Sequence, residues 1–122
     1  MRLILEDNSI RLECRESDIA KFKERSEVEE SVIFGGSFGD KFIYALRTSH
    51  SYEQLHVTLI ANELRIFVPK SLAYEWYNGE IDGFGEMIDI GEGRELLLRV
   101  DRIVEERPIQ GLSSNDSQPM EG

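Results

Sequence analysis

The side chains best suited to nucleophilic or metal chemistry in this sequence are Cys14, His50 and His56. A zinc site needs three or four converging ligands, and the one cysteine is far in sequence from the two histidines. Cys14 also falls on the apolar phase of an alternating segment with Ile10 and Leu12, so we expect a small buried core residue. We therefore expect no catalytic residue, no metal ion and no cofactor, and we expect the protein not to be an enzyme.

Two further segments have the composition of binding loops. The glycines of "GGSFGD", residues 35–40, lie between two strand-like segments, whereas a phosphate loop leads into a helix. The segment "DGFGEMIDIGEG", residues 82–93, is acidic, but Phe84 and Met87 stand where a calcium loop needs an oxygen ligand and a glycine. Both segments are therefore predicted to be ordinary turns or strands.

The charge of the chain limits its partners. It carries 24 acidic and 14 basic residues, a formal net charge of −10. An acidic surface repels nucleic-acid phosphates and anionic lipid, so a basic protein partner, or solubility alone, is the expected reason for it. The lone cysteine suits a reducing compartment. The apolar run Leu3–Leu5 is too short for a secretory signal, and no stretch is long enough for a membrane helix. We expect a cytoplasmic protein.

Alternating apolar residues predict about eight short strands, and two segments have helical spacing. The first helix is expected to begin at an N-cap Ser17 and end near Arg25, and the second to follow Pro69 with Ser71 as its N-cap and Gly79 as its stop. The strands are expected at residues 2–6, 9–14, 28–34, 41–49, 55–61, 64–69, 86–90 and 96–104.

The first half of this pattern recurs in the second half at a shift of 54 residues. Phe22 is matched by Trp76, which is therefore expected to be buried, and several polar residues are identical: Asn8 with Asn62, Arg11 with Arg65, and Ser17 with Ser71. Shared amphipathic spacing explains the apolar matches but not these polar ones. The alternative that the repeat reflects only such spacing stays open.

The predicted architecture is a mixed β/α, mainly β, fold of two ββαββ repeats that form a small barrel about a pseudo-twofold axis. Residues 1–107 are expected to form one barrel-like domain, with repeats at about 1–48 and 55–104. The polar residues 108–122 are expected to form a C-terminal tail.

Two family resemblances follow from these motifs. The segments "NSIRLECRESDIAKF" and "LRIFVPKSLAYEW" resemble the opening of AbrB/MazE-type swapped-hairpin domains, a resemblance that implies DNA binding or the capture of a toxin protein. The whole chain more closely resembles a family of small uncharacterised bacterial proteins, a domain of unknown function. The shared features are "NSIR", "VEE" before an aromatic residue and glycine, "YAL", a tryptophan-bearing helix and an acidic tail containing proline.

The leading functional hypothesis is a non-enzymatic protein that binds or regulates another protein. Its expected interaction surface includes Arg11, Arg65, Tyr74 and Tyr77, because exposed aromatic and arginine side chains mark contact surfaces. One alternative is an antitoxin-like, DNA-binding regulator, whose basic patch would be built from Arg2, Arg11, Arg65 and Lys70. Another is a small-ligand or enzyme site in the groove between the repeats.

Overall fold

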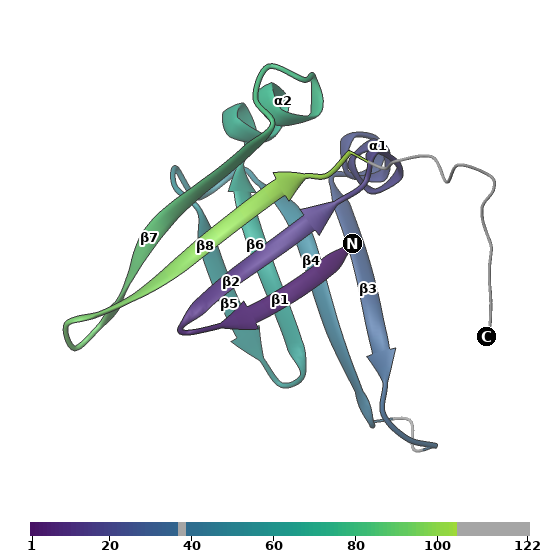
Figure 1. The fold of residues 1–122 in the computed structure, drawn as a ribbon, viewed down its shortest axis with the longest axis vertical. Helices are drawn as coiled ribbons and strands as arrows, with labels where there is room; N and C mark the ends of the chain where they lie inside the picture. Colours follow the sequence, from purple (N-terminus) through teal and green to yellow (C-terminus); the bar gives the residue numbers. More distant parts are fainter. Residues whose placement is uncertain (37–38, 105–122) are drawn as a thin grey trace, which may run out of the picture.

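The computed structural model describes residues 1–36 and 39–104, which form eight strands and two short helices (Figure 1). The first repeat comprises β1 (Arg2–Glu6), β2 (Ser9–Cys14), α1 (Glu16–Arg25), β3 (Glu27–Ile33) and β4 (Lys41–Ser49). The second comprises β5 (His56–Ile60), β6 (Glu63–Pro69), α2 (Lys70–Tyr77), β7 (Gly83–Gly91) and β8 (Arg94–Arg102). The order ββαββ thus occurs twice, which confirms the predicted fold class. The predicted tail, residues 108–122, lies outside the described residues.

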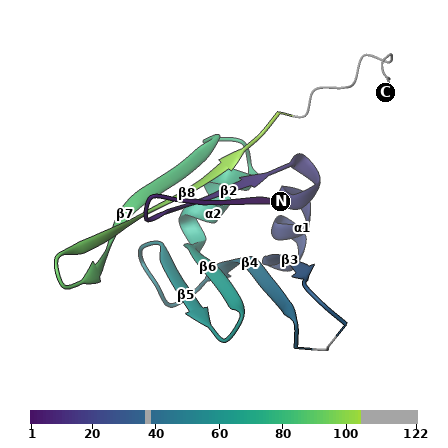
Figure 2. The same ribbon diagram turned by 60° about the horizontal axis from the view of Figure 1, so that its bottom comes forward.

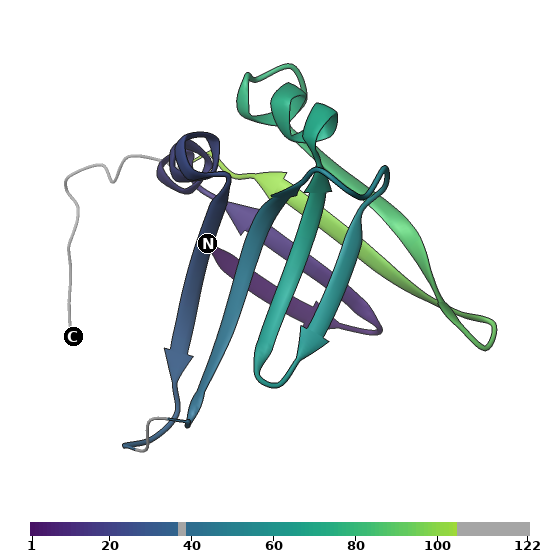
Figure 3. The same cartoon turned by 180° about the vertical axis from the view of Figure 1, so that it is seen from behind.

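The two repeats are interlocked, because each contributes one hairpin to each of two sheets. The first sheet has the order β1-β2-β8-β7 and the second β3-β4-β6-β5, as Figures 1 and 3 show from opposite sides. In both sheets two antiparallel hairpins meet through a parallel pair, β2 with β8 and β4 with β6. Exchanging each element for its counterpart in the other repeat converts one sheet order into the other. The pseudo-twofold relation therefore exchanges the two sheets.

The strand registers follow the same relation. Ser9 pairs with Leu97 in the first sheet, and Glu63 pairs with Ile43 in the second, so each residue is replaced by the one 54 positions away. The hairpins β3–β4 and β7–β8 also correspond, except that β7 is displaced by 56 residues because the segment after α2 is longer. The repeat seen in the sequence is thus a repeat of strand pairing.

The expectation of a closed barrel was wrong, because the sheets form two separate layers. In the described part of the chain, β1, β7, β3 and β5 each pair with a neighbour on one side only. Figure 2 shows the helices between the two layers at one end, while the hairpins β3–β4 and β7–β8 extend past the opposite sheet. These diverging hairpins cannot hydrogen-bond to each other, so the edges stay open.

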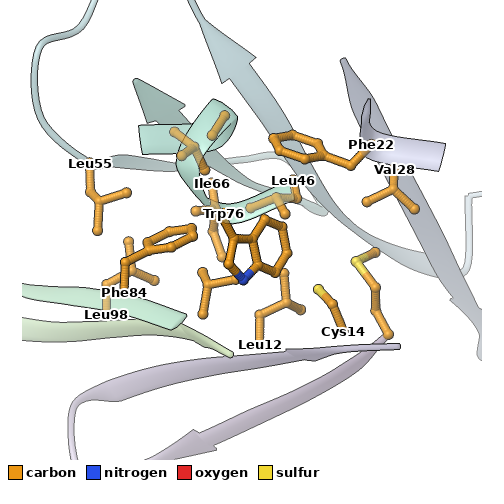
Figure 4. Close-up of a cluster of buried hydrophobic side chains, with 14 of the residues drawn as sticks. Leu12, Cys14, Phe22, Val28, Leu46, Leu55, Ile66, Trp76, Phe84 and Leu98 are labelled. Carbon is orange, nitrogen blue, oxygen red and sulfur yellow. The ribbon is translucent and has the colours of Figure 1, made fainter. Parts of the chain in front are cut away.

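The core lies between the sheets and beneath the helices. Trp76 is fully buried, as predicted, and its ring packs edge to face against Phe22 and Phe84 at centroid distances of 5.8 and 5.4 Å (Figure 4). Its indole N–H donates to the carbonyl oxygen of Asp82 at 3.1 Å, so the polar edge of the ring is satisfied. Cys14 is also fully buried, which confirms its expected place in the core.

The helix starts differ from the sequence prediction by two residues. Ser17 and Ser71 are not N-caps; the capping positions are Arg15 and Pro69, whose backbones are extended or close to it. In α1 the carboxylate of Asp18 accepts a hydrogen bond from the Arg15 amide at 2.8 Å, so it satisfies an amide that the helix leaves free. Among the described helices, none has the length and apolar character needed to cross a membrane.

Candidate functional site

The four residues predicted for an interaction surface occupy three separate places. Arg11 and Arg65 lie on the outer faces of different sheets, because their neighbours Leu12 and Ile66 point into the core. Arg65 also forms an ion pair with Glu63. Tyr74 and Tyr77 lie on α2 at the helical end and contact each other edge to face. The structure therefore does not bring the predicted arginines and tyrosines together.

The basic patch considered for DNA binding is also divided. Arg2 and Arg11 belong to the outer face of the first sheet, where the Arg2 guanidinium lies 3.8 Å from the Glu13 carboxylate. Arg65 is on the other sheet, and Lys70 begins α2. These four cations do not form one positive surface.

The residues first considered for chemistry are also dispersed. His56 stacks on Tyr52 with ring centroids 4.0 Å apart, and burial, reinforced by the nearby Asp18 carboxylate, raises the pKa of the Cys14 thiol to about 12. A thiol with such a high pKa stays protonated and unreactive near neutrality. Within residues 1–36 and 39–104, no three histidine, cysteine, aspartate or glutamate side chains are grouped as a metal site.

A polar cluster between the layers repeats with the fold. The amino group of Met1 donates to the Glu30 carboxylate at 2.8 Å, and the amide of Leu55 lies 3.4 Å from an oxygen of Glu86. Met1 and Leu55 are 54 residues apart, and Glu30 and Glu86 follow the 56-residue displacement of β7. Each repeat therefore uses an inward glutamate to bind the backbone nitrogen before its first strand. The sequence comparison missed this pair because it used one constant shift.

The first-repeat cluster has two more members. Asp18 lies 3.0 Å from the Met1 amino group, and the Tyr44 hydroxyl donates to Glu30 at 3.0 Å. Burial alone would lower the pKa of the amino group, but the two carboxylates outweigh it and raise the pKa above its ordinary value. The site is a closed ion-pair network that ties α1, β3 and β4 to the start of the chain.

The strongest surface feature is an apolar rim at the end of the sandwich opposite the helices, which we call the distal surface. Twelve large apolar side chains are exposed among the described residues, and nine of them lie on the distal halves of the hairpins. These nine are Leu5, Val32, Ile33, Phe34, Leu59, Ile60, Met87, Ile90 and Leu97.

Crossing of the sheets explains this exposure. Leu5 and Leu59 are in register with the buried residues Ile10 and Leu64, so they have the inward orientation of core residues. They are nevertheless 61% and 66% exposed, because the opposite sheet does not extend over the ends of these hairpins (Figure 1). Phe34, at the end of the β3–β4 hairpin, is 75% exposed. Alternation alone would have assigned the inward members of this group to the core.

The distal surface is also acidic. Next to the apolar rim stand seven acidic and two basic residues of the turns and strand ends: Glu6, Asp7, Asp40, Glu63, Asp89, Glu92 and Glu95, with Lys41 and Arg94. A shallow groove of about 400 Å³ between the β3–β4 and β5–β6 turns is lined by Phe34, Gly39, Asp40, Lys41, Phe42 and Asn62. Such a combination of apolar side chains with a charged surround is typical of protein contact surfaces.

A family model supports the resemblance of the whole chain to uncharacterised proteins. The model for a family of unknown function, DUF7009, matches residues 1–105. The chain belongs to this family. Searches of curated proteins and of solved structures gave no significant match. Membership therefore carries no activity, and the resemblance to swapped-hairpin domains stays a prediction.

Proposed function

We propose that this member of the DUF7009 family is a non-enzymatic binding module that engages a basic protein partner through its distal surface. The observation that carries the proposal is the concentration of nine exposed apolar side chains on an acidic rim at one end of the molecule. A monomeric soluble protein rarely leaves such a patch uncovered.

Charge defines the class of partner. Seven acidic residues against two basic ones at the distal end favour a partner surface rich in lysine or arginine around apolar side chains. The acidic surround also prevents the apolar rims of two copies from approaching closely, because like charges would face each other. The same charges oppose nucleic-acid phosphates.

Affinity capture with matched variants tests the proposal. Leu59→Asp introduces a charge at an exposed distal position, whereas Tyr74→Asp does the same on α2 at the opposite end, where the parent tyrosine is 56% exposed. A protein captured by the wild type should then be purified and its affinity for each variant measured by calorimetry. We expect Leu59→Asp to weaken binding at least about tenfold and Tyr74→Asp to leave it unchanged.

The opposite outcomes are equally informative. Loss of binding in Tyr74→Asp with retention in Leu59→Asp would move the interface to α2 and contradict the distal assignment. A captured partner whose own contact surface is acidic would contradict the charge argument. Thermal melts of both variants ensure that any loss reflects contact and not unfolding.

A further inference from the structure

The open architecture leaves four strand edges, and they differ in length. The edges β1 and β5 each contain five residues, β3 contains seven, and β7 contains nine. Short edges offer few unpaired backbone groups, whereas a long edge is a template for another strand. The two longer edges, β3 and β7, occupy equivalent positions in the two repeats, so their differences in sequence can be compared directly.

The β3 edge carries charges on its outer face that β7 lacks. Glu27 and Glu29 of β3 correspond to Gly83 and Gly85 of β7. Charged side chains on an edge strand discourage pairing with another chain. At Gly85 a Cβ atom would lie 2.8 Å from the carbonyl oxygen of Leu98, so close approach of the β8 backbone requires a glycine there. The consequence is a smooth β7 edge.

The β7 edge is also unoccupied. Within the described chain, the backbone groups of residues 83–90 form their hydrogen bonds only with β8, and no helix covers their free side (Figure 1). The β-bulge between Asp89 and Gly91 ends the regular ladder, which leaves Gly83–Asp89 as the usable edge. Every second residue of such a strand directs its N–H and C=O groups to the free side.

The surroundings of this edge select the chemistry of an added strand. Residues 80–95 contain six acidic side chains and one basic one, and the hairpin exposes Met87, Ile90 and Leu97. An extended segment that alternates apolar and basic residues would place its apolar side chains against Met87 and Leu97 while its cations approach the carboxylates. A second copy of β7 would instead place like charges opposite each other.

We infer that β7 accepts an extended, apolar and basic peptide segment as an additional strand at the free edge Gly83–Asp89. This inference rests on the proposed function, since the segment would belong to the partner protein. Its recognition would come from main-chain hydrogen bonds along the edge, and its selectivity from the acidic hairpin.

The test uses a synthetic peptide, acetyl-KVKITVKIK-amide, and the full chain. Two isomers of this peptide carry N-methyl groups either on the valine and isoleucine amides or on the alternate amides, so that each blocks one side of the extended backbone. We expect the parent and one isomer to bind, and the other isomer to bind at least about tenfold more weakly. Side-chain contacts alone would treat the two isomers alike, and that result would overturn strand addition.

Equivalent substitutions on the two long edges locate the site. Met87→Lys adds a like charge beside the proposed peptide, and Ser31→Lys adds it at the corresponding position of β3. We expect Met87→Lys to weaken peptide binding about tenfold, Ser31→Lys to leave it unchanged, and peptide-induced amide shifts in NMR spectra to concentrate on residues 83–89. Equal effects of the two substitutions would overturn the assignment to β7.

Two further results separate this inference from the proposed function. Absence of peptide binding, together with a natural partner that Leu59→Asp releases, would overturn strand addition and leave the distal surface as the interface. A homodimer that Met87→Lys dissociates would make a second copy the occupant of the edge and would overturn the peptide assignment. Sedimentation of the wild type and of both lysine variants measures this directly.

Discussion

Phe22 and Trp76, which hold equivalent positions in the two repeats, meet edge to face with their ring planes at 63°. Both side chains are fully buried, and each comes from the helix of its own repeat. The pseudo-twofold relation therefore passes close to an aromatic contact at the helical end of the core. Because the helices hold the two layers together there, this contact couples the stability of one repeat to that of the other.

Replacing Trp76 by alanine should strongly destabilise the protein. The substitution removes the largest fully buried side chain, its contacts with Phe22 and Phe84, and the hydrogen bond to the Asp82 carbonyl. We expect a loss of roughly 3–5 kcal/mol in the free energy of unfolding, measured by urea denaturation. The wild type should show the blue-shifted emission of a buried indole.

The matched control is Tyr74→Ala, because Tyr74 lies on the same helix and is 56% exposed. We expect its effect to be below about 1 kcal/mol. A red-shifted emission spectrum together with an unchanged melting temperature in Trp76→Ala would contradict the core assignment.

The turn between β5 and β6 contains a strained residue that can be relieved. Ala61 has a φ of +55°, in the left-handed region, where its equivalent in the first repeat is Asp7 at +47°. An L-residue with a Cβ pays about 1–2 kcal/mol there, and asparagine tolerates the conformation best among non-glycine residues. We expect Ala61→Asn to raise the free energy of unfolding by about 0.5–1 kcal/mol, measured by urea denaturation.

A control at the same hairpin separates strain from general surface effects. Leu59→Asn changes an exposed residue with ordinary backbone angles, so it should not stabilise the protein. If Ala61→Asn had no effect or lowered stability, the strain at residue 61 would not limit the stability of this turn.

Arg102 ties the last strand to both helices. Its guanidinium donates to the carbonyl oxygen of Trp76 at 2.6 Å, near the end of α2, and its Nε lies 3.4 Å from the carboxylate of Glu16 at the start of α1. A cation satisfies the free carbonyls at a helix end. We expect Arg102→Met to cost about 1–3 kcal/mol in thermal or urea unfolding.

Removing only the carboxylate partner should matter less. Glu16 is 66% exposed, so its attraction to Arg102 is weakened by solvent, and Glu16→Gln should cost below about 1 kcal/mol. A larger loss in Glu16→Gln than in Arg102→Met would show that the ion pair, and not the bond to the Trp76 carbonyl, gives Arg102 its role.

The local elements of this fold could be predicted from the sequence, because each reflects a local pattern. Strand β4 was predicted with its observed bounds, Lys41–Ser49, since alternation from Phe42 to Leu46 is regular and bounded by turn residues. The shared asparagines also have a structural reason. The side chains of Asn8 and Asn62 donate to the Glu95 and Gly39 carbonyls, so each ties the first hairpin of one repeat to the other repeat.

The arrangement of these elements was less accessible. The parallel pairing of Ser9 with Leu97 joins residues far apart in sequence, and no local pattern records it. The layers stay open because the hairpins cross, which also leaves Leu59 exposed although its phase in the strand is that of a core residue. Whether the distal surface binds a partner depends on that crossing, and alternation carries no information about it.

Alkaline pH should destabilise the protein through groups that stay protonated when folded. Burial raises the pKa of the Cys14 thiol to about 12, and burial with the hydrogen bond to Glu30 raises the pKa of Tyr44 to about 12. The unfolded chain releases these protons from pH 9 for the thiol and pH 10 for the phenol. Because the folded state binds more protons in this window, stability is full below pH 9 and falls as the pH rises toward 12.

The Met1 amino group acts in the same direction, since its pKa is also raised, from an ordinary value of 8.0. Urea unfolding under reducing conditions between pH 8 and pH 11 should therefore show a decline whose slope is up to about 1.4 kcal/mol per pH unit for each fully titrating group. Tyr44→Phe removes one of these groups and should make the decline above pH 10 shallower. Tyr74→Phe, which changes an exposed phenol, should reproduce the wild-type slope. If Tyr44→Phe also reproduced it, the proton on Tyr44 would not be linked to folding, and the closed network around Glu30 would not hold in solution.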